Sequence, residues 1–393
     1  MARPRRESTW STVGFATPRG APRPAATPRR ITKVALVSFS SGSWQPDRFL
    51  DGYSQRTLSL GPDPDGESPI TATLVRRADT TPARGAVLYL HGFTDYFFHE
   101  PLADFFVARG YSFYAIDLRK CGRSRLPHHT AHFTTDLAQY DEELGAALDI
   151  IVEEVGPDTR VIVAGHSTGG LVTSLWLDRL RRRNPRLHGV VDGLLLNSPW
   201  LDLQGDAILR TLPVSLLIKG IGALAPKRVI PLGMSSAYGE SLHDSAHGEW
   251  NYDLSAKPLG GFPVTFGFLD AVRTGQRHLH HGIDVGVPAL VLRSDKSHFA
   301  RTYSESTDRA DAVLDVSQIA RWSGCLGGRV TAVPIPDARH DVFLSVPHAR
   351  ENAYSEVDNW LTHVVGPGRD PGSRYDTGSR YDTGSTEESE NTL

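Results

Sequence analysis

The stretch that decides the fold reads Arg160-Val161-Ile162-Val163-Ala164-Gly165-His166-Ser167-Thr168-Gly169-Gly170 and continues into a helical pattern. Its apolar first half predicts a buried strand. The Gly-x-Ser-x-Gly pattern that follows predicts a sharp turn from that strand into a helix over 168–182. Gly165 and Gly169 suit such a turn, because a Cβ atom at either position would crowd the strand against the helix. Ser167 would then project its hydroxyl above a sheet, where it can act as a nucleophile.

Short β-branched runs alternate with longer stretches of helical period on both sides of this motif. Such alternation is typical of an α/β fold with a mostly parallel sheet and crossover helices. The eight predicted strands are 56–60, 70–77, 86–90, 112–116, 160–164, 190–196, 288–292 and 329–335. The predicted helices include 101–109, 134–155, 168–182 and 349–364. The first two strands precede any helix, so we expect them to form an antiparallel edge.

The same pattern divides the chain into regions. Residues 35–200 and 288–367 form the predicted core, whereas residues 201–287 are too many for a connecting loop and predict an inserted subdomain. Residues 1–34 are basic and rich in proline, and residues 368–393 contain a short direct repeat. We expect both tails to be disordered, because they hold too few apolar side chains to offset the entropy of ordering.

Charge and cysteine content narrow the range of partners. The 393 residues include 42 Lys and Arg against 45 Asp and Glu, so no global positive field favours nucleic acid. Two cysteines are too few for a disulfide framework or a thiolate metal cage, which suits a reducing cytoplasm. No apolar run reaches the roughly 18 to 20 residues of a membrane-spanning helix. We therefore expect a cytoplasmic protein without integral membrane association, a nucleic-acid partner or a metal site.

A nucleophilic serine needs a base, and His340 has a suitable position. It lies in a polar loop after the last predicted strand, 329–335, and before the final predicted helix. An unperturbed imidazole has a pKa of about 6.5, so it can accept the Ser167 proton and return it to a leaving group near neutral pH.

Two backbone amides are candidates for an oxyanion hole, which stabilises the negative charge that develops on a carbonyl oxygen. One belongs to Thr168, directly after Ser167. The other belongs to Phe93, in the loop that follows the predicted strand 86–90.

Several motifs along the chain resemble those of the α/β-hydrolases. In the order found in that superfamily they are His91-Gly92-Phe93, Asp117-Leu118-Arg119-Lys120-Cys121-Gly122-Arg123-Ser124, Gly165-His166-Ser167-Thr168-Gly169-Gly170, Asn197-Ser198-Pro199-Trp200 and Arg339-His340-Asp341. They are similar to the branch of monoacylglycerol lipases, lysophospholipases and serine-aminopeptidase-like enzymes, over roughly residues 50–365. The resemblance implies an eight-stranded sheet with a helical cap, or lid, after the sixth strand, which residues 201–287 match. We expect the aliphatic stretch 212–224 of this cap to cover Ser167.

Two aspartates compete for the role of the acid that orients His340. Members of the family usually carry this aspartate two or three residues past the glycine that ends the seventh strand, and this chain departs from that pattern. Asp295 follows the predicted strand 288–292 closely. Asp311 begins an acid-x-Val-Leu stretch before a helix, which resembles the usual motif displaced by an insertion. We favour Asp311 and keep Asp295 as the alternative.

The resemblance implies an esterase that forms an acyl-enzyme through a triad of Ser167, Asp311 and His340, without a cofactor. Its expected substrate is a small, lipid-like ester with an apolar acyl chain, similar to a monoacylglycerol or a lysophospholipid. Serine peptidase, thioesterase or acyltransferase chemistry on the same scaffold stays open, because a fold does not fix a substrate. A non-catalytic ligand-binding homologue stays open as well, and the sequence does not predict the oligomeric state.

Overall fold

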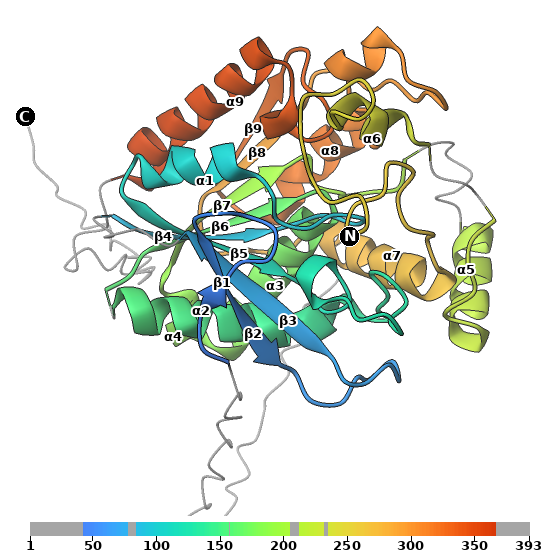
Figure 1. The fold of residues 1–393 in the computed structure, drawn as a ribbon, viewed down its shortest axis with the longest axis horizontal. Coiled ribbons are helices and arrows are strands. Elements are labelled where there is room, and N and C mark those ends of the chain that lie inside the picture. Colours follow the sequence, from blue (N-terminus) through green and yellow to red (C-terminus); the bar gives the residue numbers. More distant parts are fainter. Residues whose placement is uncertain (1–41, 78–83, 157, 205–211, 232–234, 367–393) are drawn as a thin grey trace, which may run out of the picture. The chain divides into compact units, whose positions relative to one another are not determined.

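A nine-stranded sheet runs through the part of the chain that the structure describes, residues 42–77, 84–156, 158–204, 212–231 and 235–366 of a computed structural model (Figure 1). The strands are β1 (Gln45–Pro46), β2 (Tyr53–Ser59), β3 (Thr71–Arg77), β4 (Gly85–Leu90), β5 (Tyr111–Asp117), β6 (Val161–His166), β7 (Val191–Asn197), β8 (Ala289–Ser294) and β9 (Val330–Ile335). Their order across the sheet is β1-β2-β3-β5-β4-β6-β7-β8-β9. The tails predicted over 1–34 and 368–393 lie outside the described residues.

The predicted α/β class with a mostly parallel sheet is confirmed, whereas the sheet has nine strands rather than eight. The additional strand, β1, is two residues long and pairs with the edge strand β2, so no hydrophobic period could reveal it. The first three strands and the β3–β5 pair are antiparallel, and β4 to β9 pair in parallel. The predicted antiparallel edge is therefore present.

Helices cover both faces of the sheet. They are α1 (Glu100–Val107), α2 (Asp141–Val155), α3 (Thr168–Arg183), α4 (Pro185–His188), α5 (Leu212–Leu224), α6 (Ala237–Leu242), α7 (Phe266–His280), α8 (Val316–Trp322) and α9 (Pro347–Trp360). Helices α1 and α9 lie on one face of the sheet, and α2 and α3 lie on the other (Figure 1). Their buried side chains belong to two separate apolar clusters. Among the described residues, no helix is long and apolar enough to cross a membrane.

The ends of α2 show how the sequence sets a helix boundary. The stretch predicted as one helix over 134–155 begins as a 3₁₀ turn, Leu137–Tyr140, and becomes α-helical at three consecutive acidic residues, 141–143, which complement the positive end of the helix dipole. Gly156 ends the helix with a φ of 119°, a conformation that side chains disfavour.

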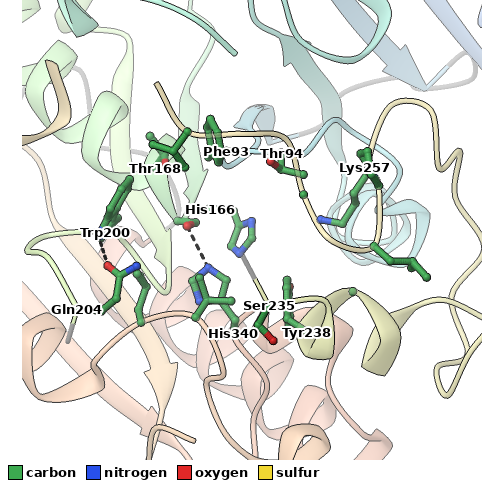
Figure 2. Close-up of a pocket in the computed structure, with 18 of the residues that line it drawn as sticks. Phe93, Thr94, His166, Thr168, Trp200, Gln204, Ser235, Tyr238, Lys257 and His340 are labelled. Carbon is green, nitrogen blue, oxygen red and sulfur yellow. Dashed lines mark hydrogen bonds between the residues drawn. The ribbon is translucent and has the colours of Figure 1, made fainter. Parts of the chain in front are cut away.

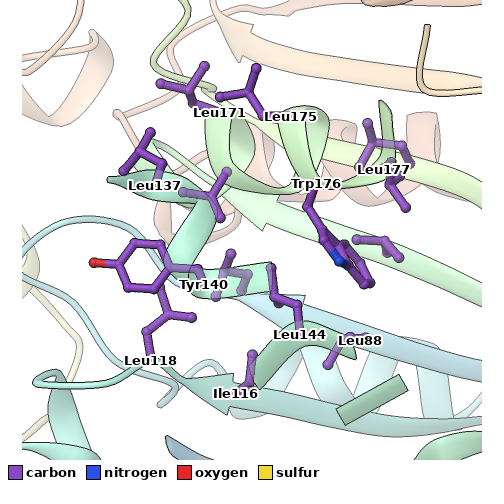
Figure 3. Close-up of a cluster of buried hydrophobic side chains, with 14 of the residues drawn as sticks. Leu88, Ile116, Leu118, Leu137, Tyr140, Leu144, Leu171, Leu175, Trp176 and Leu177 are labelled. Carbon is purple, nitrogen blue, oxygen red and sulfur yellow. The ribbon is translucent and has the colours of Figure 1, made fainter. Parts of the chain in front are cut away.

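One large apolar cluster fills the space between the sheet and the helices α2 and α3 (Figure 3). It includes Leu88, Ile116, Leu118, Leu137, Tyr140, Leu144, Leu171, Leu175, Trp176 and Leu177. Strands β4, β5 and β6 are buried along their whole length, because helices cover them on both faces. Such strands read as continuous apolar runs rather than as alternating patterns.

The region between β7 and β8 contains α5, α6 and α7 (Figure 1). Helix α7 packs its Phe268, Ala271 and Val272 side chains into the same apolar cluster as α3. The boundaries 201–287 of an inserted subdomain stay a prediction.

Candidate active site

The turn between β6 and α3 holds Ser167 in a strained backbone conformation. Its φ of 53° and ψ of −117° lie in a region that residues with a Cβ atom avoid, at a cost on the order of 1–3 kcal/mol. Close packing explains the glycines on either side. A Cβ atom on Gly165 would lie 2.7 Å from the Gly169 carbonyl oxygen, and one on Gly169 would lie 2.4 Å from the His91 carbonyl oxygen. The Ser167 amide donates to the Asn197 carbonyl at 2.9 Å, which ties the turn to the end of β7.

The structure brings Ser167, His340 and Asp311 into one hydrogen-bonded chain. His340 Nε2 lies 3.0 Å from Ser167 Oγ, and His340 Nδ1 lies 2.9 Å from Asp311 Oδ2. All three residues are buried. A carboxylate at Nδ1 favours the tautomer with its proton on Nδ1, which leaves Nε2 free to accept a proton from the serine hydroxyl.

Asp311 reaches His340 after a long excursion of the chain beyond β8. The segment leaves β8 at Ser294 and is closed at its base, where the Asp311 amide donates to the Lys296 carbonyl at 2.9 Å. Asp311 Oδ1 accepts hydrogen bonds from the amides of Val313 and Leu314, at 2.8 and 2.7 Å. These two bonds leave Oδ2 directed at the imidazole.

Asp295 occupies a different environment. Its side chain is 35% exposed, and its carboxylate lies 3.8 Å from Lys296 Nζ and accepts a hydrogen bond from the Asp337 amide. The structure therefore places Asp311, and not Asp295, beside the imidazole.

Phe93 and Thr168 lie on the same cavity as Ser167 and His340. Thr168 is the first residue of α3, so its amide belongs to the first turn, whose N–H groups have no partner within the helix. Phe93 comes from the loop after β4, which packs closely on the serine turn: a Cβ atom on Gly92 would lie 3.0 Å from the Ser167 Cβ. Figure 2 shows Phe93 and Thr168 across the cavity from His340 and Tyr238.

The cavity has a volume of about 160 Å³ and is lined mainly by apolar groups. Beside the residues already named, its walls include Thr94, His166, Trp200, Gln204, Ser235, Tyr252, Lys257, Pro258, Leu259, Val264, Val313 and Leu314. The aliphatic helix α5, expected to cover Ser167, contributes none of its described side chains to these walls, and its Leu216 and Leu217 are more than half exposed. Segments after α5 supply that side of the cavity instead.

A second group of buried polar side chains lies beside His340, with the His166 ring centroid 5.0 Å from that of His340. His166 Nδ1 donates to Asp95 Oδ2 at 3.2 Å, and Lys257 Nζ donates to Asp95 Oδ1 at 2.8 Å. His99 Nε2 and Asn197 Nδ2 donate to the two oxygens of Asp341, at 2.8 and 2.7 Å.

The surroundings lower the pKa of both carboxylates in this group. Burial alone would raise the pKa of Asp95, but the Lys257 charge and the His166 hydrogen bond hold it well below its ordinary value. Burial acts on Asp341 in the same way, and the His166 and His99 imidazoles lower its pKa.

Sequence reasoning missed this group of residues, although some signal was present. His166 and Asn197 belong to the motifs that the resemblance used, and Asp341 directly follows His340. No pattern marked Lys257, which lies in the region between β7 and β8, far from any motif.

Comparison with known proteins agrees with this architecture. A family profile described as "Serine aminopeptidase, S33" matches residues 81–312, more than half of the chain. The chain is 30% identical over 175 residues to the phospholipase YtpA of Bacillus subtilis (strain 168), a match that covers 44% of this chain and 61% of that protein. The chain thus matches less than two thirds of the length of this relative.

Two solved structures share the fold. A soluble variant of monoglyceride lipase from Saccharomyces cerevisiae is 15% identical, with a TM-score of 0.55 over 75% of this chain and 91% of that one. The monoacylglycerol lipase of Paleococcus ferrophilus is 18% identical, with a TM-score of 0.54 over 74% and 98%. Because the profile covers more than half of the chain, this chain belongs to the serine aminopeptidase S33 family of α/β-hydrolases.

Proposed function

We propose that this protein is a serine hydrolase that cleaves carboxylic esters of apolar acyl chains, with monoacylglycerols or lysophospholipids as its substrate class. One observation carries the proposal: Ser167, His340 and Asp311 form a continuous hydrogen-bonded chain beside an apolar cavity, with links of 3.0 and 2.9 Å. A serine in such a chain is an activated nucleophile.

The first half of the reaction forms an acyl-enzyme. Ser167 Oγ attacks the ester carbonyl carbon while its proton moves to His340 Nε2, and the carbonyl oxygen becomes an oxyanion that accepts hydrogen bonds from the Phe93 and Thr168 amides. Asp311 stabilises the imidazolium that results. His340 then gives the proton to the leaving alcohol oxygen as the carbon–oxygen bond breaks.

The second half of the reaction releases the acid. A water molecule gives its proton to His340 Nε2 and attacks the acyl carbon, which forms a second oxyanion in the same hole. The bond to Ser167 Oγ breaks, Oγ regains its proton from His340, and the carboxylic acid leaves the cavity.

The lining of the cavity favours an ester of a fatty acid over a peptide with a free amino terminus. An aminopeptidase needs a negative group to pair with the substrate ammonium, and none of the described residues that line the cavity is acidic. The names of the relatives, a phospholipase and two monoacylglycerol lipases, support the same substrate class.

The proposal includes a cap formed by residues 201–287. Described residues of this region, among them Tyr238, Leu259 and Val264, supply walls of the cavity opposite the sheet-derived residues. Such a cap would shield the acyl chain from water while Ser167 reacts.

Labelling by a fluorophosphonate probe tests the nucleophile. The wild-type protein should be labelled and the Ser167→Ala variant should not, whereas an unlabelled wild type would favour a ligand-binding protein without activity. Turnover of monoacylglycerols, lysophospholipids, acyl thioesters and aminoacyl amides, compared at equal enzyme concentration, then ranks the ester against thioesterase and peptidase activity. Transfer to an added alcohol would reveal an acyltransferase.

A further inference from the structure

Asp95 connects the two backbone segments that carry the proposed oxyanion amides. It lies two residues after Phe93, and it accepts a hydrogen bond from His166, which lies two residues before Thr168. The Asp95 side chain is 1% exposed and the His166 side chain 3%. One buried carboxylate therefore fixes the spacing of two segments that are 71 residues apart in the sequence.

Each of these segments contains a residue with a strained backbone conformation. Thr94 has a φ of 54° and Ser167 a φ of 53°, both in the left-handed region that favours glycine. Such residues persist only where surrounding contacts hold them. The oxyanion geometry thus depends on groups that anchor the two segments from outside.

Lys257 is such an anchor, and it comes from the inserted region. It is only 5% exposed, and its ammonium lies 2.8 Å from Asp95 Oδ1. Three aromatic rings, Phe98, Tyr238 and Tyr252, lie 5.6 to 5.8 Å from the ammonium, within the range of cation–π attraction. Figure 2 shows the Lys257 side chain directed toward His166.

A neighbouring contact ties the same two regions together. The amide of Phe262 donates to Thr94 Oγ1 at 2.9 Å, so the segment from 257 to 262 holds the strained residue as well as the carboxylate beside it. Without Lys257, the buried Asp95 carboxylate would lose the ammonium that compensates its charge. A buried carboxylate without a compensating charge either takes up a proton or turns toward water.

We infer that Lys257 is a positioning residue for the oxyanion hole: through its ion pair with Asp95 it holds the Phe93 and Thr168 segments at the spacing that the transition state requires. This inference rests on the proposed function and deepens it. The inserted region then contributes to catalysis itself, in addition to forming a wall of the cavity.

The inference predicts a particular kinetic effect. The oxyanion exists only in the transition state and the tetrahedral intermediates, so a disturbed hole should lower kcat and leave KM nearly unchanged. Loss of a whole oxyanion donor costs about 10²- to 10³-fold in kcat, and a displaced donor should cost less, so we expect Lys257→Met to lower kcat about 10- to 100-fold. Lys257→Arg can keep an ion pair with Asp95 and should stay within about threefold of the wild type.

The control is Lys227→Met. Lys227 also comes from the inserted region and forms an ion pair with Glu67 at 2.8 Å, but it lines no part of the cavity. We expect its kcat and KM to stay within twofold of the wild-type values.

An alkylboronic acid separates positioning from a general loss of folded protein. Its adduct with Ser167 mimics the tetrahedral intermediate, so its inhibition constant should rise in Lys257→Met by the factor by which kcat/KM falls. A smaller fraction of folded enzyme would lower kcat but leave the inhibition constant unchanged, and that result would overturn the inference. A kcat within twofold of the wild type in folded Lys257→Met would overturn it as well.

The wild-type arm reports on the proposed function alone. Absence of ester hydrolysis by the wild-type protein would refute that function, whereas an active wild type with an unaffected Lys257→Met variant refutes only the role of Lys257. If Lys257→Met does not fold, the double variant Asp95→Asn/Lys257→Gln carries the test, because it leaves no unpaired buried charge. We expect it to lose at least about tenfold in kcat, since neutral amides hold the strained segments less firmly, and a wild-type kcat would overturn the inference.

Discussion

Replacing Asp311 by asparagine should remove the charge beside His340 and change little else. Asp311 Oδ1 accepts the amide protons of Val313 and Leu314, and the carbonyl oxygen of an asparagine can accept both. The asparagine NH₂ group then faces His340 Nδ1, where Asp311 Oδ2 lies 2.9 Å away. An NH₂ group cannot accept the Nδ1 proton, so the imidazole must carry its proton on Nε2, toward Ser167.

The magnitude follows from this change of tautomer. An imidazole protonated at Nε2 cannot take the Ser167 proton, and no carboxylate remains to stabilise the imidazolium. We expect kcat to fall about 10⁴-fold, the loss found when a serine triad keeps its geometry but loses the charge of its acid. At about 1.36 kcal/mol per factor of ten, this corresponds to about 5.4 kcal/mol of transition-state free energy.

Steady-state hydrolysis of an activated fatty-acid ester measures the effect, with a melting curve to show that the variant is folded. Asp295→Asn is the matched control, because Asp295 lies on the excursion after the same strand but touches Asp337 and Lys296 instead of His340. It should lose less than about tenfold, well under the loss for a triad acid. The assignment would be refuted by an Asp311→Asn variant that keeps more than a tenth of the wild-type kcat. It would also be refuted by an Asp295→Asn variant that loses more kcat than Asp311→Asn does.

Three further predictions follow from the site. Ser167→Ala and His340→Ala should each lose on the order of 10⁶ in kcat, and the double variant should be little worse, because the two groups act as a unit; near-normal hydrolysis by either single variant would contradict the roles assigned to them. Catalytic efficiency on a series of acyl esters should rise with chain length until the cavity is full, with each methylene lowering the transition-state free energy by at most about 0.8 kcal/mol. A flat profile from acetyl to octanoyl esters would favour a small-acyl enzyme or a peptidase. The pKa of Asp341 is lower in the folded state than the value of about 3.9 expected in the unfolded state, so its ionised carboxylate stabilises the fold above about pH 4. This stability is lost as the pH falls toward the folded-state pKa. The free energy of unfolding, measured in urea, should therefore depend less on pH below about pH 4 in Asp341→Asn than in the wild type.

The fold class could be predicted from the sequence because many residues along the chain contribute to the hydrophobic pattern that indicates it. Buried central strands such as β4 and β6 are continuous apolar runs, and the glycines around Ser167 mark a turn that only small residues can make. Strand β1 could not be predicted from the sequence, because its two exposed residues, Gln45 and Pro46, show no hydrophobic period. Pairing with the neighbouring strand, rather than local preference, makes them a strand.

The contacts within the site could be predicted for residues close to the end of a strand, but not for a residue far along the chain from one. Ser167 follows β6 directly and His340 lies five residues past the end of β9, so a parallel sheet brings both to one edge. Asp311 lies 17 residues past the end of β8, and only the closure of that excursion by backbone hydrogen bonds, such as that between Asp311 and Lys296, brings it back. The sequence could therefore favour Asp311 through its acid-x-Val-Leu stretch, but it had to keep Asp295 as the alternative because Asp295 lies closer to the strand.

The same sheet edge explains the positions of the buried polar residues beside His340, except that of Lys257. Asn197 ends β7, which lies between the strand of Ser167 and the strand that leads to Asp311, and its side chain binds both Asp341 Oδ1 and the Val342 amide, at 2.7 and 3.1 Å. The last residue of β7 thus fixes the loop that carries His340, which gives its position at the carboxyl edge a physical reason. The sheet does not explain the position of Lys257, because this residue reaches Asp95 from the region between β7 and β8. The role inferred for Lys257 implies that substitutions in the region between β7 and β8 alter the rate of the chemical step as well as the choice of acyl chain.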